Sequence, residues 1–241
     1  MLKTLRYIFI SLIIIVTHTY ATAQTEPQKV VQEKQHGISV GVDLAPFIQK
    51  AFDPGRTGVG FTGRLTLKNK WFGIAEAGFE SVKFADKRKK DREKIIDIYD
   101  YNSYGSYLRV GLDYDFFDVD EPGNNDNITL GMRYGFALQD HECPSFKIID
   151  DYWGHFEDKI SKNTVNSHWV EFVFGLRSEV LKNFYMGWTI RLRQIIAVNK
   201  NNILEPYTIP GYGRRDNSTN LGFTYTLEYQ IPFGKKKRAI N

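Results

Sequence analysis

The stretch from Val165 to Gln194 constrains the fold most, because it reads as two strands joined by the short turn Leu181-Lys182-Asn183. Side chains on a strand alternate between two faces, so alternate residues can be compared as sets. In each arm one set is largely apolar and the other consists of charges and glycines. The apolar sets are His168, Val170, Phe172, Phe174, Leu176, Ser178 and Val180, then Phe184, Met186, Trp188, Ile190 and Leu192. Arms of about 10–15 residues are long enough to cross a membrane when tilted.

The same alternation recurs along the chain, which gives eight segments in all. They are 38–44, 59–67, 71–80, 104–116, 128–139, 168–180, 184–194 and 221–233. Short connections alternate with long ones, and we expect the three long ones (86–102, 140–164 and 198–217) to be loops on the outer side. An even strand number with such alternation is typical of bacterial outer-membrane barrels. The predicted fold is all-β, an eight-stranded antiparallel up-and-down transmembrane β-barrel in the bacterial outer membrane.

The N-terminus carries the features of a secretory signal peptide. Lys3 and Arg6 precede an apolar run from Tyr7 to Val16, and Ala21-Thr22-Ala23 fits a cleavage site. The expected organisation is a signal peptide at 1–23, a polar periplasmic lead-in at 24–36, the barrel at 37–233 and a basic periplasmic tail at 234–241.

Charge and cysteine content exclude some classes of function. The chain has 32 basic and 28 acidic residues, and removing Lys3 and Arg6 leaves 30 against 28. This near-balance does not favour nucleic acid as a partner. The single Cys143 rules out an intramolecular disulfide. Around it, the spacing of His141, Glu142 and Cys143 matches no zinc pattern, so we expect no metal site and no cofactor.

The polar face of the strands is predicted to line the lumen. Glycines concentrate on it, which suits a narrow eight-stranded interior, and its charges are Arg, Asp and Glu with almost no Lys, which suits buried pairing. The alternative, a soluble lipocalin-like barrel, would place the apolar face inside. Near-balanced charges predict mutual neutralisation and a closed lumen. They are Arg64, Lys68, Arg109, Arg133, Arg177, Arg191 and Arg193 against Asp43, Glu76, Glu80, Asp113, Asp115, Glu171, Glu179 and Glu228.

Two sets of residues are candidates for binding. If the lumen is instead a narrow channel or binds a small anionic ligand, Arg191 and Arg193 would face that ligand. The candidate lumen residues are Arg109, Glu171, Arg177, Arg191 and Arg193. The basic run Lys87, Arg88, Lys89 and Lys90 would meet lipopolysaccharide phosphates on the outer side.

An enzymatic function is not favoured. Ser167 and His168 lie near the outer rim, where a lipid A-modifying enzyme would place its nucleophile and base. As neighbours on a strand they point to opposite faces, and no carboxylate is spaced to orient the ring, so no catalytic residue is predicted. The loop aromatics could form a binding rim, but we favour a lid over the lumen. They are Tyr99, Tyr101, Tyr152, Trp153, Tyr207 and Tyr212.

Several motifs resemble an uncharacterised Bacteroidota family of secreted, barrel-like proteins defined by a domain of unknown function. They are 168–171, Phe174-Gly175, 186–188 with Arg191 and Arg193, Pro206-Tyr207, 209–213 and 41–44. The fold also looks like that of small OmpA-type and OmpX-type barrels. The resemblance implies outer-membrane lipids and lipopolysaccharide as surroundings. It also implies the barrel-assembly machinery as a partner, through the aromatic end of the last strand at Tyr229 and Phe233. We expect a monomer with a structural or surface-interaction role.

Overall fold

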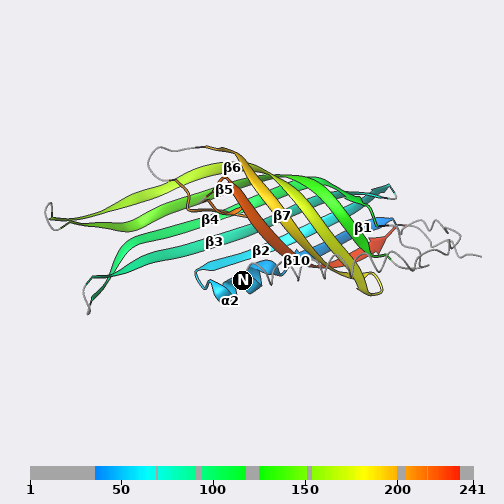
Figure 1. The fold of residues 1–241 in the computed structure, drawn as a ribbon, viewed down its shortest axis with the longest axis horizontal. Coiled ribbons are helices and arrows are strands. Elements are labelled where there is room, and N and C mark those ends of the chain that lie inside the picture. The colour runs from blue at the N-terminus through cyan, green and yellow to red at the C-terminus, as the bar shows by residue number, and fades with distance from the viewer. Residues whose placement is uncertain are drawn as a thin grey trace, which may run out of the picture. The chain divides into compact units, whose positions relative to one another are not determined.

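The described residues form an eight-stranded barrel, as the alternation predicts. The computed structural model describes residues 36–68, 70–90, 94–117, 125–150, 154–199, 205–215 and 217–233, so the predicted signal peptide, most of the predicted lead-in and the predicted C-terminal tail lie outside it. The strands run antiparallel, each beside its sequence neighbours, and close in the order β1-β10-β7-β6-β5-β4-β3-β2 (Figure 1). They are β1 (Gly37–Asp43), β2 (Arg56–Lys68), β3 (Trp71–Lys90), β4 (Lys94–Asp115), β5 (Asn127–Asp150), β6 (Gly154–Leu181), β7 (Phe184–Val198) and β10 (Thr219–Pro232).

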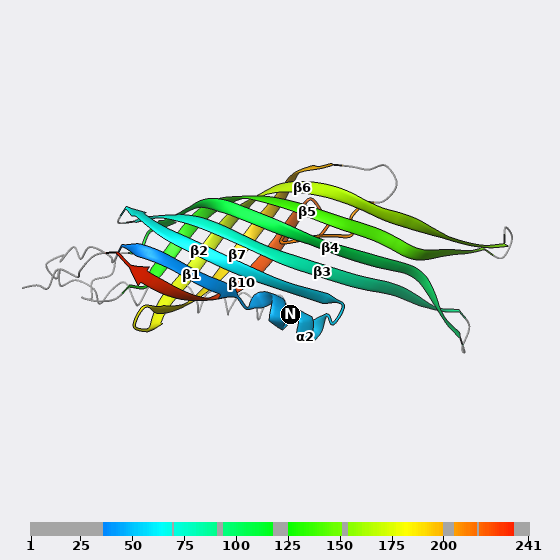
Figure 2. The same cartoon turned by 180° about the vertical axis from the view of Figure 1, so that it is seen from behind.

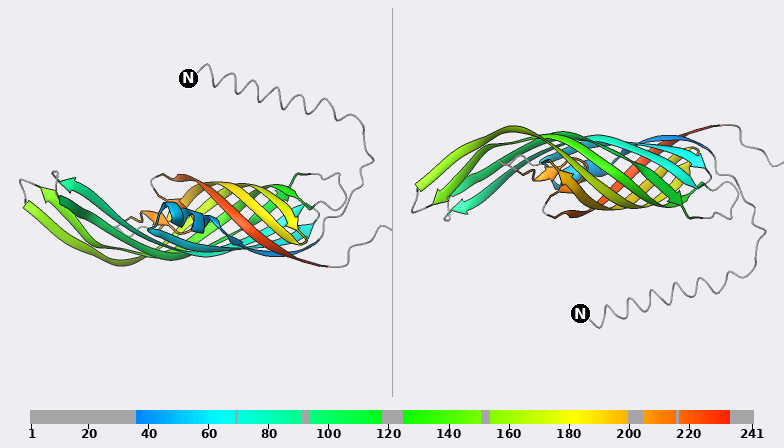
Figure 3. Two further views of the ribbon diagram at one scale, coloured as in Figure 1. Left: turned by 90° about the horizontal axis from the view of Figure 1, so that it is seen from below. Right: turned by 90° about the horizontal axis from the view of Figure 1, so that it is seen from above.

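The polar face of each strand points inward, which confirms the predicted orientation. On β7, Arg191 and Tyr185 are buried, whereas Trp188 and Ile190 expose 40% and 43% of their surface on the outside. The strands cross the barrel diagonally, as seen from below and above in Figure 3. Such tilt leaves an eight-stranded lumen only wide enough for its own side chains. Most of the large apolar side chains therefore lie on the outside, while a few rings such as Phe72, Trp169 and Tyr185 share the interior with the charges.

Two predicted loops are wrong, because their chain continues the strands instead. Within 86–102, β3 runs to Lys90 and β4 begins at Lys94; within 140–164, β5 runs to Asp150 and β6 begins at Gly154. Both hairpins extend beyond the ends of β2, β7 and β10 (Figure 2). Their residues mix polar and apolar side chains without a strict alternation, as at Phe146, Ile148 and Ile149. Their pairing is also interrupted by bulges between Asp86 and Lys87 and between His141 and Cys143. The apolar alternation that marks a half-buried strand is therefore missing from these extensions.

Strand β1 ends at mid-barrel and is followed by a helix that the sequence pattern did not predict. Helix α2 (Ala45–Phe52) carries Pro46 in its first turn, a position that proline favours. The Asp43 carboxylate accepts a hydrogen bond from the Ala45 amide at 2.9 Å at the strand-to-helix junction. Within the described residues, no helix is long and apolar enough to span a membrane.

Within the third predicted loop, the described residues 205–215 turn back into the barrel. They form a small two-stranded sheet, β8 (Thr208–Ile209) with β9 (Gly213–Arg214), around the turn Ile209-Pro210-Gly211-Tyr212. The Tyr212 amide donates to the Ile209 carbonyl at 3.1 Å, and Gly211 has a φ of 74°. Proline followed by a glycine with positive φ is the pattern of a type II turn. This turn brings aromatic and aliphatic side chains into the loop end of the lumen.

Candidate functional site

A single ion-pair network fills the middle of the barrel, and Glu76 of β3 lies at its centre. Arg191 of β7 donates to Glu76 with Nη1 to Oε2 at 2.7 Å and Nη2 to Oε1 at 3.0 Å. Arg109 approaches Glu76 Oε2 with Nε at 3.1 Å, and Arg133 also contacts the carboxylate. Glu76 and Arg109 are direct cross-strand partners, but β3 and β7 are four places apart in the ring of eight strands. The Glu76–Arg191 pair therefore spans the full width of the barrel.

Glu171 of β6 extends the network toward the loop end. It contacts Arg109 at 3.6 Å, Arg191 at 3.2 Å and Arg193 at 3.4 Å. The indole Nε1 of Trp169 also donates to Glu171 Oε1 at 2.7 Å. Arg193 is the cross-strand partner of Glu171, so antiparallel pairing itself places these two charges together.

Toward the opposite end, the network continues through two further carboxylates. Asp113 pairs with Arg133 at 3.2 Å and with Arg64 at 3.6 Å. Arg64 Nε also lies 3.7 Å from Glu228, which pairs with Arg177 at 2.8 Å. The guanidinium of Arg177 then donates to polar side chains and stacks over the Tyr185 ring at 3.4 Å. Its hydrogen-bond acceptors are Asn127, Ser39 and Gln230.

The network is buried and closely packed. Its arginines and carboxylates are each at least 91% buried, and a gap among Arg64, Glu76, Arg133 and Arg191 measures only about 10 Å³. That is about the space that holds one water molecule. Because burying an ion without a partner costs several kcal/mol, each charge here depends on its neighbours. The four candidate arginines Arg109, Arg177, Arg191 and Arg193 all have carboxylate partners within the chain.

An apolar cap covers the network at the loop end. Tyr107, Ala137 and Trp169 of the barrel wall pack with Ile209 and Tyr212 of the returning segment, and all five are buried. The Trp169 and Tyr212 rings meet edge to face with centroids 5.9 Å apart. Gly211 lies against the Tyr107 ring so closely that a Cβ would come within 2.5 Å of it. We call residues 205–215 the cap segment.

Polar contacts fix the cap segment in place. Arg193 Nη1 donates to the Tyr212 carbonyl at 2.7 Å, and Gln139 Nε2 donates to the Thr208 carbonyl at 2.9 Å. The Gly211 amide donates to Glu80 Oε2 at 3.3 Å. Tyr101 accepts from the Tyr207 amide at 3.3 Å. Thus Tyr101, Tyr207 and Tyr212 pack at the loop end as the lid prediction expects, while Tyr152 and Trp153 lie outside the described residues.

His141 is buried beside the cap segment. Its ring meets Tyr101 edge to face at 6.1 Å, and neither of its ring nitrogens has a hydrogen-bond partner among the described residues. Burial lowers the pKa of His141 below its ordinary value of 6.5, although the nearby Asp140 carboxylate opposes the shift. The described residues contain no cluster of three or more His, Cys, Asp or Glu side chains arranged to hold a metal ion.

Two further sequence candidates are the basic run of β3 and the adjacent residues Ser167 and His168. Lys87–Lys90 form the end of β3, but their side chains, like that of Lys68, lie outside what the structure describes. Ser167 points inward and is buried, while His168 lies on the outer face, where its Nδ1 is 2.5 Å from the Tyr134 hydroxyl. This arrangement does not form a serine–histidine pair.

Comparison with known proteins supplies a family. No curated protein shows significant similarity to the chain. Among solved structures, the chain is similar to Ail, the attachment invasion locus protein of Yersinia pestis, at 9% identity and a TM-score of 0.36, over 83% of this chain and 99% of that one.

It is also similar to the backbone structure of the Yersinia pestis outer membrane protein Ail in a phospholipid bilayer nanodisc, at 12% identity and a TM-score of 0.34, over 82% and 100% of the chains. Because these TM-scores are low, the barrel assignment rests on the strand pairing described above. A family model described as a domain of unknown function (DUF6048) matches residues 4–236, so the chain belongs to that family.

Proposed function

We propose that this protein is a non-enzymatic outer-membrane β-barrel with a closed, salt-bridged lumen. We place it in a Bacteroidota envelope, as its sequence motifs indicate. Its role is envelope integrity or surface interaction through the strands that extend beyond the barrel.

The observation that carries the proposal is the apolar belt on the outside of the barrel. Cross-strand partners line up Leu112, Met132, Phe172, Leu192 and Leu221, one from each of five strands, and each is at least 48% exposed. In water this row would be a large exposed apolar patch, which soluble monomers rarely carry.

The height of the belt suits a membrane. On β5 its residues run from Ile128 to Leu138, which is about 33 Å of strand at about 3.3 Å per residue. A tilt of about 40° reduces this to about 25 Å, the height of the apolar band in outer-membrane barrels.

The ion-pair network supports a closed lumen over a channel or an anion-binding site. An anionic ligand would need arginines that are free to pair with it. Arg191 already pairs with Glu76 and Glu171, and Arg193 already pairs with Glu171. A channel would need water along its axis, whereas the cap segment and the Glu76–Arg191 pair cross that axis.

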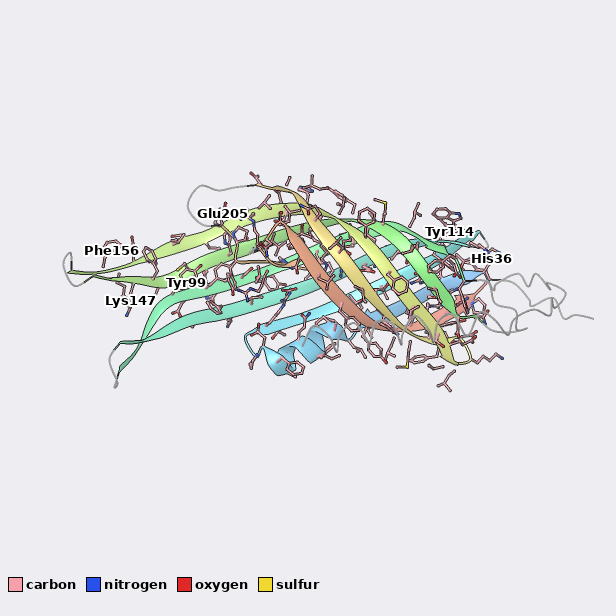
Figure 4. The ribbon with its side chains drawn as sticks, viewed as in Figure 1. His36, Tyr99, Tyr114, Lys147, Phe156 and Glu205 are labelled. Carbon is pink, nitrogen blue, oxygen red and sulfur yellow. The ribbon has the colours of Figure 1, made fainter. Side chains whose placement is uncertain are left out.

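The extended hairpins support surface interaction. Among the described residues, β6 has no strand partner on its β7 side before Ser167, and β3 has none on its β2 side beyond Val82. Exposed strand edges can pair with an extended segment of another protein. In Figure 4, Lys147 and Phe156 lie on this extension, at the opposite end of the molecule from Tyr114 and His36.

Three measurements test the proposal. The protein should fractionate with outer membranes and migrate differently on gels before and after heating; recovery as a soluble periplasmic protein would overturn the assignment. In planar bilayers it should give no steady large conductance, and such a conductance would refute the closed lumen. An epitope tag placed between Asp150 and Gly154 should be reached by antibody on intact cells, whereas the same tag between Lys182 and Asn183 should not.

A further inference from the structure

A polar groove crosses the outer face of the barrel immediately beyond the apolar belt. Its volume is about 300 Å³, and it runs over β3, β4, β5 and the start of β6. This volume is at the lower end of the range for small-molecule sites. Its lining includes Ser81, Lys83, Asn102, Tyr104, Glu142 and Lys162.

The strand register shows how far the groove lies from the edge of the apolar belt. Phe79, Ser106 and Leu138 form the last row of the belt, since Ser106 pairs with the other two across β4. Two residues further out, the next row is Ser81, Tyr104 and Asp140. The surface therefore changes from apolar to hydrogen-bonding over about 7 Å of strand.

A third row, Lys83, Asn102 and Glu142, follows in the same register. If the belt lies in lipid, these two polar rows lie at the level of the head groups.

An ion pair and two hydrogen bonds within the protein hold the polar side chains of the groove in place. Lys162 Nζ lies 2.8 Å from Asp140 Oδ2, and Thr164 Oγ1 donates to Asp140 Oδ1 at 2.6 Å. Asn102 Nδ2 donates to Glu142 Oε1 at 3.1 Å. These contacts hold the side chains while leaving further lone pairs and N–H groups for a ligand. Tyr104 exposes 59% of its surface and provides an aromatic face in the same row as Asp140.

This chemistry matches a sugar better than a phosphate. The groove carries two lysines and two carboxylates, Lys83 and Lys162 against Asp140 and Glu142, so its net charge is near zero. Lys162 is engaged by Asp140 rather than available to an anion. A saccharide ring offers hydroxyls that both donate and accept, together with an apolar C–H face that packs on an aromatic ring.

We propose that the groove binds the saccharide head group of an outer-leaflet glycolipid, with Tyr104 under the sugar ring and Asn102, Asp140 and Glu142 bonded to its hydroxyls. The inference rests on the proposed membrane location, because only a glycolipid would present a sugar at this level while its acyl chains lie along the belt.

The test uses the full-length protein purified in detergent and titrated with lipopolysaccharide, with phosphatidylglycerol as an anionic lipid without sugar. Wild-type protein should bind lipopolysaccharide at least about tenfold more tightly than phosphatidylglycerol. The double variant Tyr104→Ala/Glu142→Gln should lose about tenfold in lipopolysaccharide affinity, as expected when one or two hydrogen bonds and a packing contact disappear. Its affinity for phosphatidylglycerol should not change.

Tyr114→Ala is the matched control, because Tyr114 is an outward tyrosine on the same strand β4 at the other end of the belt. It should bind lipopolysaccharide as wild type does. Equal loss in both variants, no preference of the wild type for lipopolysaccharide, or equally tight binding of a free glucosamine disaccharide would each overturn the inference. Heat-dependent gel migration and outer-membrane fractionation are measured in parallel. If both measurements support an outer-membrane barrel but the wild type does not prefer lipopolysaccharide, the groove inference fails while the proposed membrane location stands.

Discussion

Glu76 and Arg191 lie 115 residues apart in the chain and are joined by two hydrogen bonds across the width of the barrel. Neither strand neighbours the other, so this contact forms only when the sheet closes. It ties together two strands, β3 and β7, that share no backbone hydrogen bonds. Glu76 also neutralises Arg109 and Arg133, so three buried arginines depend on its charge.

We predict that Glu76→Gln strongly destabilises the barrel. The amide keeps the size of the side chain but removes the charge shared by three buried arginines. Breaking a buried pair in this way costs about 3–5 kcal/mol. The measurement is the urea concentration at which half of the protein is unfolded, with the unfolded fraction read from the gel shift between folded and unfolded forms.

Glu157→Gln serves as its control, because Glu157 pairs with Lys147 at 3.2 Å on the exposed hairpin. Surface pairs contribute about 0–1 kcal/mol, so this midpoint should barely move. Similar midpoints for the two variants would show that the buried network does not stabilise the barrel.

We also predict that Gly135→Ala destabilises the barrel while Gly73→Ala does not. At Gly135 a Cβ would overlap the buried ring of Trp169, which cannot move because Tyr212 and Glu171 hold it. Overpacking of this kind costs about 1–3 kcal/mol. At Gly73 the nearest atom would be a Leu67 methyl at 3.8 Å, an ordinary contact. Thermal midpoints of the gel shift compare the two, and equal values would contradict the expected overlap.

The sequence was sufficient to predict the strands of the barrel wall, because alternation records which face is apolar. It also indicated that Arg109, Glu171 and Arg191 share one interior. It could not show which ions pair across the lumen, since Glu76 and Arg191 are brought together only by the closure of eight strands. Helix α2 was missed because Pro46 reads as a strand break, although a proline in the first turn is also a helix signal.

The hairpin extensions were missed for a different reason. Polar and apolar residues follow one another there without strict alternation, so pairing follows from the register that the adjoining barrel strands have already set. The cap segment had a visible signal in Pro210-Gly211 and Tyr212, but a turn motif does not say that the turn points inward.

Loss of the Tyr212 ring should release the cap segment without unfolding the barrel. The ring is fully buried against Trp169, and removing a buried aromatic side chain costs about 3–5 kcal/mol. In Tyr212→Ala, backbone amides of 207–212 should exchange hydrogen faster, while the amides of β7 stay protected. Tyr229→Ala, on the outer face of β10, should leave the cap unchanged. Equal exchange rates in wild type and Tyr212→Ala would show that the ring does not hold the segment.

Acidification should loosen the cap segment through His141. Because burial lowers the pKa of His141 in the folded protein below 6.5, the opened state takes up a proton more readily than the closed one. Closure of the cap is therefore unaffected by this group above about pH 6.5 and weakens as the pH falls below that value. Hydrogen exchange of the 207–212 amides should accelerate between pH 7.5 and 5 after correction for intrinsic rates.

His141→Gln should abolish this acceleration, since glutamine does not titrate. His168→Gln, on the outer face beside Tyr134, should retain it. The acid-sensitive step would lie elsewhere if the His141→Gln protein still loosened over the same pH range.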